Sequence, residues 1–171
     1  EQNFTKYAPN QGSPDLIQTI VRKFSLENGL HFEPSQILVS NGAKQCVFNA
    51  LQAICNKGDE VVLTGPHCPD YPEMVRLVDA VPVVVKTVFD QKFKPEARDI
   101  RRAINQKTKA VLINSPNNPS GAVYSRSLLE DIALIAKDAG VYIISDEVYE
   151  KLIYGTARHC SVGSLKPVRD Q

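Results

Sequence analysis

Ala110-Val111-Leu112-Ile113 leads directly into Asn114-Ser115-Pro116-Asn117-Asn118-Pro119-Ser120-Gly121, so an apolar run ends in a loop rich in Pro, Asn and Gly. Residues 141–150 repeat this plan, with Val141-Tyr142-Ile143-Ile144 running into Ser145-Asp146-Glu147-Val148-Tyr149-Glu150. Short apolar runs bounded by turn residues are typical of buried parallel strands. Ligands of open α/β sheets bind at the carboxyl ends of the strands. We therefore expect Asn118, Asp146 and Tyr149 at a ligand-binding edge.

Helix and strand patterns alternate along the rest of the chain. Ser13 and Pro14 are typical of a helix start, and an amphipathic pattern follows to about residue 28. The periodicity predicts further helices over about 43–56, 71–78, 96–105 and 126–139, and strands over 37–39, 60–64, 81–88, 110–114 and 141–145. Such alternation indicates the α/β class, with a mainly parallel sheet between two helical layers in a three-layer αβα arrangement.

The length of the chain predicts a single domain. Its 171 residues, 43% of them hydrophobic, suffice for one buried core, and we expect one domain over residues 1–171. Residues 1–12 read as an irregular N-terminal segment. Lys151-Leu152-Ile153-Tyr154 could form one more strand, whereas residues 164–171 show little that could be buried.

Charge and cysteine usage exclude several classes of function. The formal net charge of +1 arises from 20 basic and 19 acidic residues that are interspersed, which gives no reason to expect nucleic acid or a membrane surface as partner. No apolar run approaches a transmembrane span. The four cysteines show neither CxxC spacing nor a Cys/His zinc pattern. We therefore expect no metal site, and reduced thiols in a cytoplasmic protein.

Two further features could carry ligand chemistry. Gly42-Ala43-Lys44 lies between a predicted strand and a predicted helix, so its amides would sit at a helix N-terminus, where a phosphate is favoured. An ordinary Asn-Gly turn at Asn41-Gly42 is the alternative. Asp146 ends an apolar strand, and a carboxylate buried there needs a partner. That partner could be a cationic ligand or, alternatively, the backbone amides of the next segment.

The motifs at 40–45, 115–121 and 145–150 together resemble the large domain of the class I/II aminotransferases, the fold type I family that uses pyridoxal phosphate (PLP). The resemblance covers nearly the whole chain. It implies that the backbone around Gly42, Ala43 and Lys44 faces the cofactor phosphate, and that Lys44 is not the Schiff-base lysine. It also implies that Asp146 pairs with the protonated pyridine nitrogen.

The same resemblance assigns roles to three more side chains. Asn118 and Tyr149 would hydrogen-bond the ring hydroxyl of the cofactor, although an Asn-Pro turn and a half-buried aromatic are the simpler interpretations. Tyr7 matches a position whose hydroxyl reaches the cofactor phosphate of the neighbouring subunit, which implies a homodimer. A surface tyrosine near a frayed chain end is the alternative.

The sequence departs from the family pattern at Cys68. The family usually places an aromatic side chain over the pyridine face at this position, and a thiol offers much less stacking area. His67 could serve as an acid or a base, but a loop histidine without an identified partner is more often simply exposed.

The resemblance implies amino transfer between an amino acid and a 2-oxo acid, with Asp146 and Tyr149 in the catalytic machinery. A PLP-dependent lyase of the same fold, or a non-catalytic module that binds a phosphorylated ligand or dimerises, is the alternative. A nucleotide-binding Rossmann domain is disfavoured because no GxGxxG sequence occurs.

The family's Ser-x-Ser-Lys segment, which carries the Schiff-base lysine, does not occur after residue 150. We therefore expect a truncated chain that lacks the C-terminal part of the family fold and is inactive alone. Which amino acid serves as substrate is not determined by these motifs.

Overall fold

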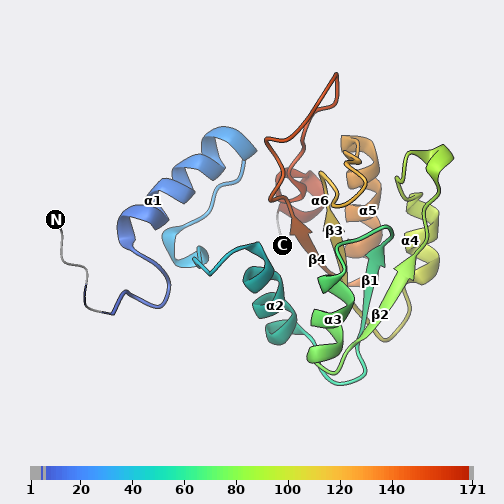
Figure 1. The fold of residues 1–171 in the computed structure, drawn as a ribbon, viewed down its shortest axis with the longest axis horizontal. Helices are drawn as coiled ribbons and strands as arrows, with labels where there is room; N and C mark the ends of the chain where they lie inside the picture. The colour runs from blue at the N-terminus through green and yellow to red at the C-terminus, as the bar shows by residue number, and fades with distance from the viewer. Residues whose placement is uncertain (1–4, 6, 170–171) are drawn as a thin grey trace.

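The computed structural model describes residue 5 and residues 7–169, in which helices pack on both faces of one four-stranded sheet (Figure 1). The strands are β1 (Glu60–Thr64), β2 (Val81–Val85), β3 (Thr108–Asn114) and β4 (Tyr142–Asp146). The helices are α1 (Pro14–Lys23), α2 (Ala43–Ile54), α3 (Asp70–Leu77), α4 (Ala97–Ala103), α5 (Arg126–Ala139) and α6 (Lys166–Arg169). Single helical turns lie at η1 (Phe24–Asn28), η2 (Pro34–Gln36), η3 (Phe89–Gln91) and η4 (Val162–Ser164).

The sheet is parallel throughout, in the order β2-β1-β3-β4. All carboxyl ends of its strands therefore lie at one edge. The β3–β4 ladder pairs Ala110 with Tyr142 and ends with Asn114 opposite Asp146. This register brings the two polar loops of the sequence, which follow β3 and β4, side by side.

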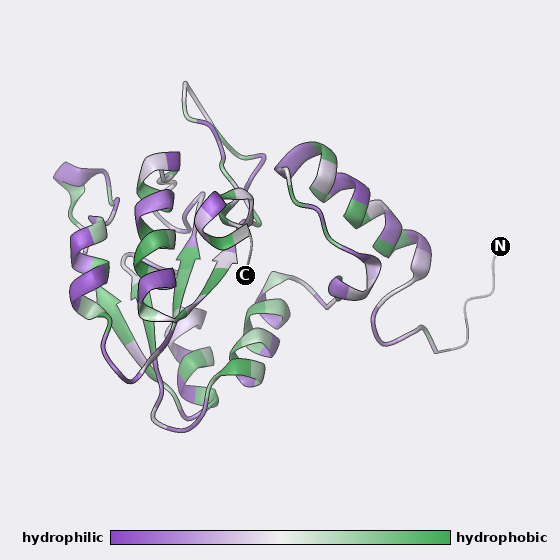
Figure 2. Ribbon diagram, turned by 180° about the vertical axis from the view of Figure 1, so that it is seen from behind, coloured by the Kyte–Doolittle hydropathy of each residue, from purple (hydrophilic) through white to green (hydrophobic). Residues whose placement is uncertain are grey.

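The alternation of side chains along the strands builds two separate cores. Val62, Val111 and Ile113 face α4, α5 and η4, while Val61, Leu63, Ala110 and Leu112 face α2 and α3. Figure 2 shows the apolar strands enclosed by helices that carry both polar and apolar residues. Because each sheet face is covered by helices, the strands have apolar centres and place polar residues at their ends. The predicted three-layer α/β arrangement is confirmed.

The helix α5 has end signals that are legible in the sequence. The Ser125 side chain accepts a hydrogen bond from the Leu128 amide at 3.3 Å, and Gly140 ends the helix with a φ of 65°. A hydroxyl at the N-cap and a left-handed glycine after the last turn are the ordinary start and stop of a helix. α5 thus runs over the predicted range, 126–139.

The segment before α2 stands beside the sheet and contributes no strand to it. The helix α1 continues as the π-helical turn η1, and both lie to one side of β4 (Figures 1 and 2). The strand predicted over 37–39 is wrong, because Val39 pairs only with Gln11, whose carbonyl accepts from the Val39 amide at 2.9 Å. Gly12, with a φ of 116°, packs so closely on Val39 that a Cβ would lie 2.6 Å from Cγ2.

Two expectations for the C-terminal region are also wrong. Residues 151–154 form a turn and irregular chain, and Leu152 is 56% exposed. Conversely, the region after 160 does contribute to the core, since Val162 and Leu165 pack with α5 and Leu165 is fully buried. Two isolated apolar residues in a polar segment show no periodicity, so their burial is not visible from the sequence.

Among the described residues, no helix combines the length and the apolar character needed to cross a bilayer. The four cysteines, all described, are unpaired.

Replacing Leu165 with Ala should lower the free energy of unfolding by about 2–5 kcal/mol, because a fully buried side chain would leave a cavity against α5. Urea denaturation of the variant and the wild type measures the difference. Leu152→Ala is the matched control, since that leucine is exposed, and should change stability by at most about 0.5 kcal/mol. Equal losses in the two variants would contradict the burial of Leu165.

Candidate ligand site at the carboxyl edge of the sheet

Asn114 holds the loops after β3 and β4 together at the carboxyl edge of the sheet. Its Nδ2 donates to the Asp146 carbonyl at 3.1 Å, and its Oδ1 accepts from the Asn118 amide at 2.7 Å. The Ser115 amide also donates to the Asp146 carbonyl, at 3.2 Å. The backbone that carries Asn118 is therefore tied to the end of β4.

The Asp146 carboxylate is held by two donors. Tyr71 Oη donates to Oδ2 at 2.7 Å, and the Val148 amide donates to Oδ1 at 3.1 Å. Tyr71 comes from α3 and is 5% exposed. Burial first, and then its hydrogen bond to Asp146, raise the pKa of Tyr71 well above its usual range. The phenol therefore remains a donor, and Asp146 is presented as an acceptor.

A cavity of about 910 Å³ joins Asp146 to the start of α2. Gly42, Ala43 and Asp146 all line it. Gly42 has a φ of 88° and ends the loop so that the α2 amides begin at Ala43. In the described part of the chain, the amides of Ala43 and Lys44 have no acceptor, as is general for a first helical turn. The cavity thus has hydrogen-bond donors at one wall and a carboxylate at another.

The Lys44 side chain is occupied in a surface contact. Its Nζ pairs with Asp70 Oδ2 at the start of α3, and the hydrogen bond from Lys44 lowers the pKa of Asp70. Cys68 Sγ donates to the same carboxylate oxygen at 3.7 Å. The Lys44 ammonium group is therefore directed toward α3, and its backbone amide remains available to a ligand at α2.

The other predicted site residues lie at varying distances from the cavity. Cys68 packs against the core cluster that contains Tyr71. Cys68, Asn118 and Tyr149 do not line the cavity itself. Tyr7 is fully exposed, in a segment that extends away from the sheet (Figure 1).

His67 contacts only its neighbour among the described residues, with Nδ1 3.0 Å from the Cys68 carbonyl oxygen. The suggestion that His67 acts as an acid or a base stays a prediction.

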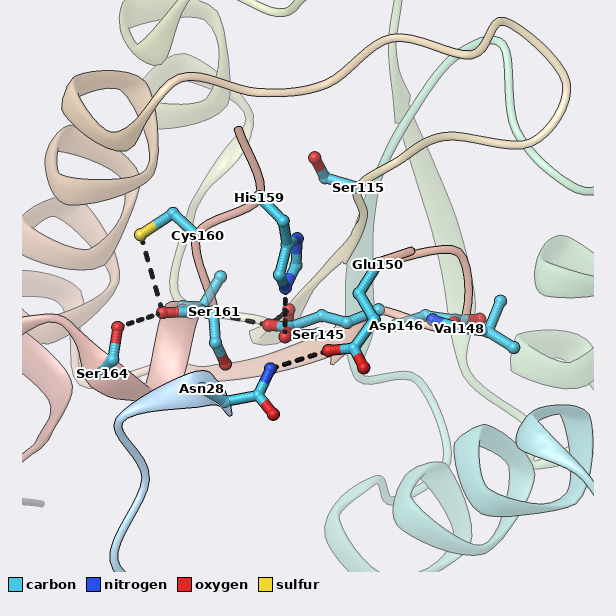
Figure 3. A network of polar contacts seen from close by, with 12 residues as sticks. Asn28, Ser115, Ser145, Asp146, Val148, Glu150, His159, Cys160, Ser161 and Ser164 are labelled. Carbon is cyan, nitrogen blue, oxygen red and sulfur yellow. Dashed lines mark hydrogen bonds and ion pairs between the residues drawn. The ribbon is translucent and has the colours of Figure 1, made fainter. Parts of the chain in front are cut away.

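A second polar cluster adjoins the site on the far side of β4. Glu147, Glu150 and His159 place one potential ligand atom each within 4.8 Å of the others. Figure 3 shows Glu150 and His159 of this cluster. Their atoms are already engaged: Lys23 Nζ pairs with Glu150, Asn28 Nδ2 donates to Glu150 at 2.7 Å, and His159 Nε2 lies 3.0 Å from Glu147. The Lys23 ammonium group and the hydrogen bonds within the cluster occupy the positions that a metal cation would need. The expected absence of a metal site stays a prediction.

Sequence reasoning missed four residues that shape this region: Tyr71, Asn114, Glu147 and His159. Each acts through a partner at least twelve residues away, or through a buried carboxylate, so no local motif marks it. Asn114 was the most accessible to prediction, because an amide side chain at the last position of a buried strand needs a partner.

Above about pH 10, the ordinary pKa of tyrosine in an unfolded chain, unfolding should release a proton that the folded Tyr71 retains. The unfolded state then binds fewer protons, so the free energy of unfolding should fall as pH rises, by up to about 1.4 kcal/mol per pH unit for this group. Tyr71→Phe should make that slope shallower, as measured by urea denaturation between pH 9 and 11, roughly one unit either side of the reference pKa.

Tyr154→Phe removes an 85% exposed phenol and should keep the wild-type slope. Some slope should persist in Tyr71→Phe, because burial also raises the pKa of Tyr124. The same slope in the wild type and in Tyr71→Phe would contradict the assignment.

Comparison with known proteins shows which family the chain resembles over nearly its whole length. The family model "Aminotransferase class I and II" matches residues 1–169. An aspartate aminotransferase from a Bacillus species is 46% identical over 165 residues, covering 96% of this chain and 42% of that protein. An aspartate/prephenate aminotransferase from Thermus thermophilus is 45% identical over 166 residues, covering 97% of this chain and 43% of that protein.

Solved structures agree as well. The structure of the Thermus thermophilus aspartate aminotransferase with maleate superposes with a TM-score of 0.92 at 45% identity, over 94% of this chain and 42% of that one. An aromatic aminotransferase from Pyrococcus horikoshii gives a TM-score of 0.92 at 37% identity, over 95% and 44%. The chain therefore spans less than half the length of the relatives it matches.

Proposed function

The chain belongs to the class I and II aminotransferase family, and we propose that it is the major part of the cofactor-binding domain of a PLP-dependent aminotransferase. The predicted fold class, the α/β fold of fold type I PLP-dependent enzymes, is confirmed by the matching structures. The extent of the domain, the truncation and the absence of the Schiff-base lysine stay predictions.

The observation that supports cofactor binding is the placement of unpaired amides at the start of α2 and of the Asp146 carboxylate at the carboxyl edge of the sheet, where Gly42, Ala43 and Asp146 line one cavity. Unpaired amides at the start of a twelve-residue helix suit a phosphate dianion, because the helix dipole and the free N–H groups both favour negative charge. A carboxylate fixed as an acceptor suits a protonated ring nitrogen, because that nitrogen has one N–H to donate. The residues at the two walls therefore fit the two charged ends of PLP.

Each residue then has a specific task. The amides of Ala43 and Lys44 would bind the phosphate, with Gly42 leaving the approach open, since a Cβ there would meet no atom within 4 Å. Asp146 would hold a proton on the ring nitrogen, and Asn118 and Tyr149 would orient the ring hydroxyl. When bound, the cofactor supplies an electron-accepting ring that stabilises negative charge at the α-carbon of the substrate.

Cys68 and Tyr7 are the residues that would contact the face of the cofactor ring and the neighbouring subunit. Cys68 would offer the ring face only a small, polarisable sulfur, so we infer that phosphate and Asp146 contacts carry most of the affinity. The exposed Tyr7 would serve a neighbouring subunit in a homodimer. Its exposure and its place in an extended segment support this, because the side chain contacts nothing in its own described chain.

For substrates, we propose an amino acid and a 2-oxo acid, with aspartate as the first amino donor to test. The printed names of the relatives favour amino transfer over the lyase alternative. A cytoplasmic location is proposed from the four unpaired cysteines.

Titration of the chain with PLP, followed by absorbance and by equilibrium dialysis, tests the central claim. Saturable binding is expected, and Asp146→Asn should weaken it by at least about tenfold, because a charge-assisted hydrogen bond to the ring nitrogen would be lost. Asp131→Asn, at an exposed position of α5, is the matched control and should bind like the wild type. Unchanged affinity in Asp146→Asn would refute the role of Asp146.

Borohydride reduction of the PLP-saturated chain tests the expectation about the Schiff-base lysine. With stoichiometric PLP, peptide mapping by mass spectrometry should find no single modified lysine, because Asp70 holds the amino group of Lys44 at the start of α2, and Glu150 holds that of Lys23, which lines the cavity. One uniquely modified lysine would show that the chain contains its own Schiff-base residue.

A further inference from the structure

We propose that His159 and Glu147 form a positioning pair that holds Asp146 at the cofactor, an inference that rests on the function proposed above. Glu147 lies next to Asp146 in the chain but is anchored to the segment after residue 158. The pair would couple that segment to the placement of the catalytic turn at 146–149.

Glu147 is saturated with hydrogen bonds. Oε1 accepts from Ser145 Oγ at 2.7 Å and from the Val162 amide at 3.0 Å, and His159 Nε2 lies 3.0 Å from Oε2. The Glu147 side chain is 18% exposed and that of His159 is 13% exposed. Several donors of fixed direction leave the carboxylate one orientation, so the backbone at Glu147 is fixed with it.

The partners of the His159 ring show which nitrogen carries the proton. Nδ1 is buried and has no hydrogen-bond partner within the described residues. A buried N–H without an acceptor is costlier than a bare lone pair, which native structures tolerate more often. The Nε2–H tautomer therefore fits, and it donates to Glu147.

The turn between β4 and residue 150 is held from two sides. Figure 3 shows His159 and Asn28 approaching it from opposite directions, Asn28 toward Glu150. Glu150 binds Lys23 and Asn28 of the N-terminal segment, and Glu147 binds the segment around His159. Between these two anchors the Val148 amide donates to Asp146 Oδ1 at 3.1 Å. A shift of the Glu147 anchor would therefore move a donor of the Asp146 carboxylate.

The anchor is a carboxylate, that of Glu147, which indicates that it serves to position the turn more than to stabilise the fold. Removing a carboxylate from water is costly, and apolar packing of the same volume is often at least as stabilising. Burial alone would raise the pKa of Glu147, but the hydrogen bonds from His159, Ser145, Val162 and Ser161 outweigh it and lower the pKa. The group is thus kept as an anion whose geometry is defined by its donors.

Two substitutions of His159 separate positioning from general packing. A Gln amide nitrogen can reach the place of Nε2 and donate to Glu147, whereas the shorter Asn side chain cannot. His159→Asn should weaken PLP binding by about tenfold, and His159→Gln should restore most of the wild-type affinity. Arg158→Ala, at the exposed neighbouring position, is the control and should bind PLP like the wild type.

The amide exchange of Val148, followed by NMR without cofactor, supplies a readout that does not depend on PLP. Exchange should be faster in His159→Asn than in the wild type, and close to wild type in His159→Gln. If His159→Asn does not fold, Ser145→Ala, which removes one donor to Glu147 and leaves the His159 contact, should show a smaller change in the same direction.

The outcomes distinguish the two claims. Wild-type chain that binds no PLP, or an Asp146→Asn variant that binds as well as wild type, overturns the proposed function and this inference with it. Weakened binding in Asp146→Asn together with wild-type binding and Val148 exchange in His159→Asn overturns the positioning pair alone. Equal weakening by Asn and Gln at position 159 also overturns it, because the hydrogen bond to Glu147 would then be irrelevant.

Discussion

The parallel pairing of β3 with β4, which sets Asn114 opposite Asp146, is the constraint on which the rest of the site depends. Because β3 is buried along nearly its whole length, its backbone cannot slide against β4 without exposing apolar side chains. The polar residues that follow β3 and β4 therefore lie side by side at the carboxyl edge of the sheet, in a fixed register. Asn114 completes the arrangement, since its side chain bonds the backbone of both loops.

Three carboxylates occupy five consecutive positions at that edge, and each meets different donors. Asp146 faces Tyr71 and the cavity, Glu147 faces His159 and Val162, and Glu150 faces Lys23 and Asn28. Like charges at such spacing repel unless donors or cations compensate them. All three carboxylates line the cavity, but Glu150 is paired with the Lys23 ammonium group and Glu147 accepts from three donors. Asp146 has two neutral donors, Tyr71 Oη and the Val148 amide, so it is the carboxylate best suited to a cationic ligand.

The N-terminal segment is joined to the sheet domain largely by polar contacts near this turn. Lys23 and Asn28 bind Glu150, and Lys151 binds Glu27 at 2.6 Å. The Lys151–Glu27 pair is exposed and contributes little to stability, whereas the Lys23–Glu150 pair is partly buried. The same turn that presents Asp146 therefore also positions η1 and the end of α1.

Local sequence determined the elements with strong periodicity or clear end signals, including α5 with Ser125 and Gly140, and the apolar runs that became β1, β3 and β4. It also marked Gly42, Asn118, Asp146 and Tyr149, because turn residues and polar groups that end buried strands stand out from their neighbours. The strand predicted over residues 37–39 is absent, since an apolar triplet becomes a strand only where another strand lies beside it. Tertiary structure alone decided that Tyr71 meets Asp146, that His159 meets Glu147 and that Leu165 is buried, because each contact joins segments whose proximity follows from the packing of whole elements and not from any local pattern.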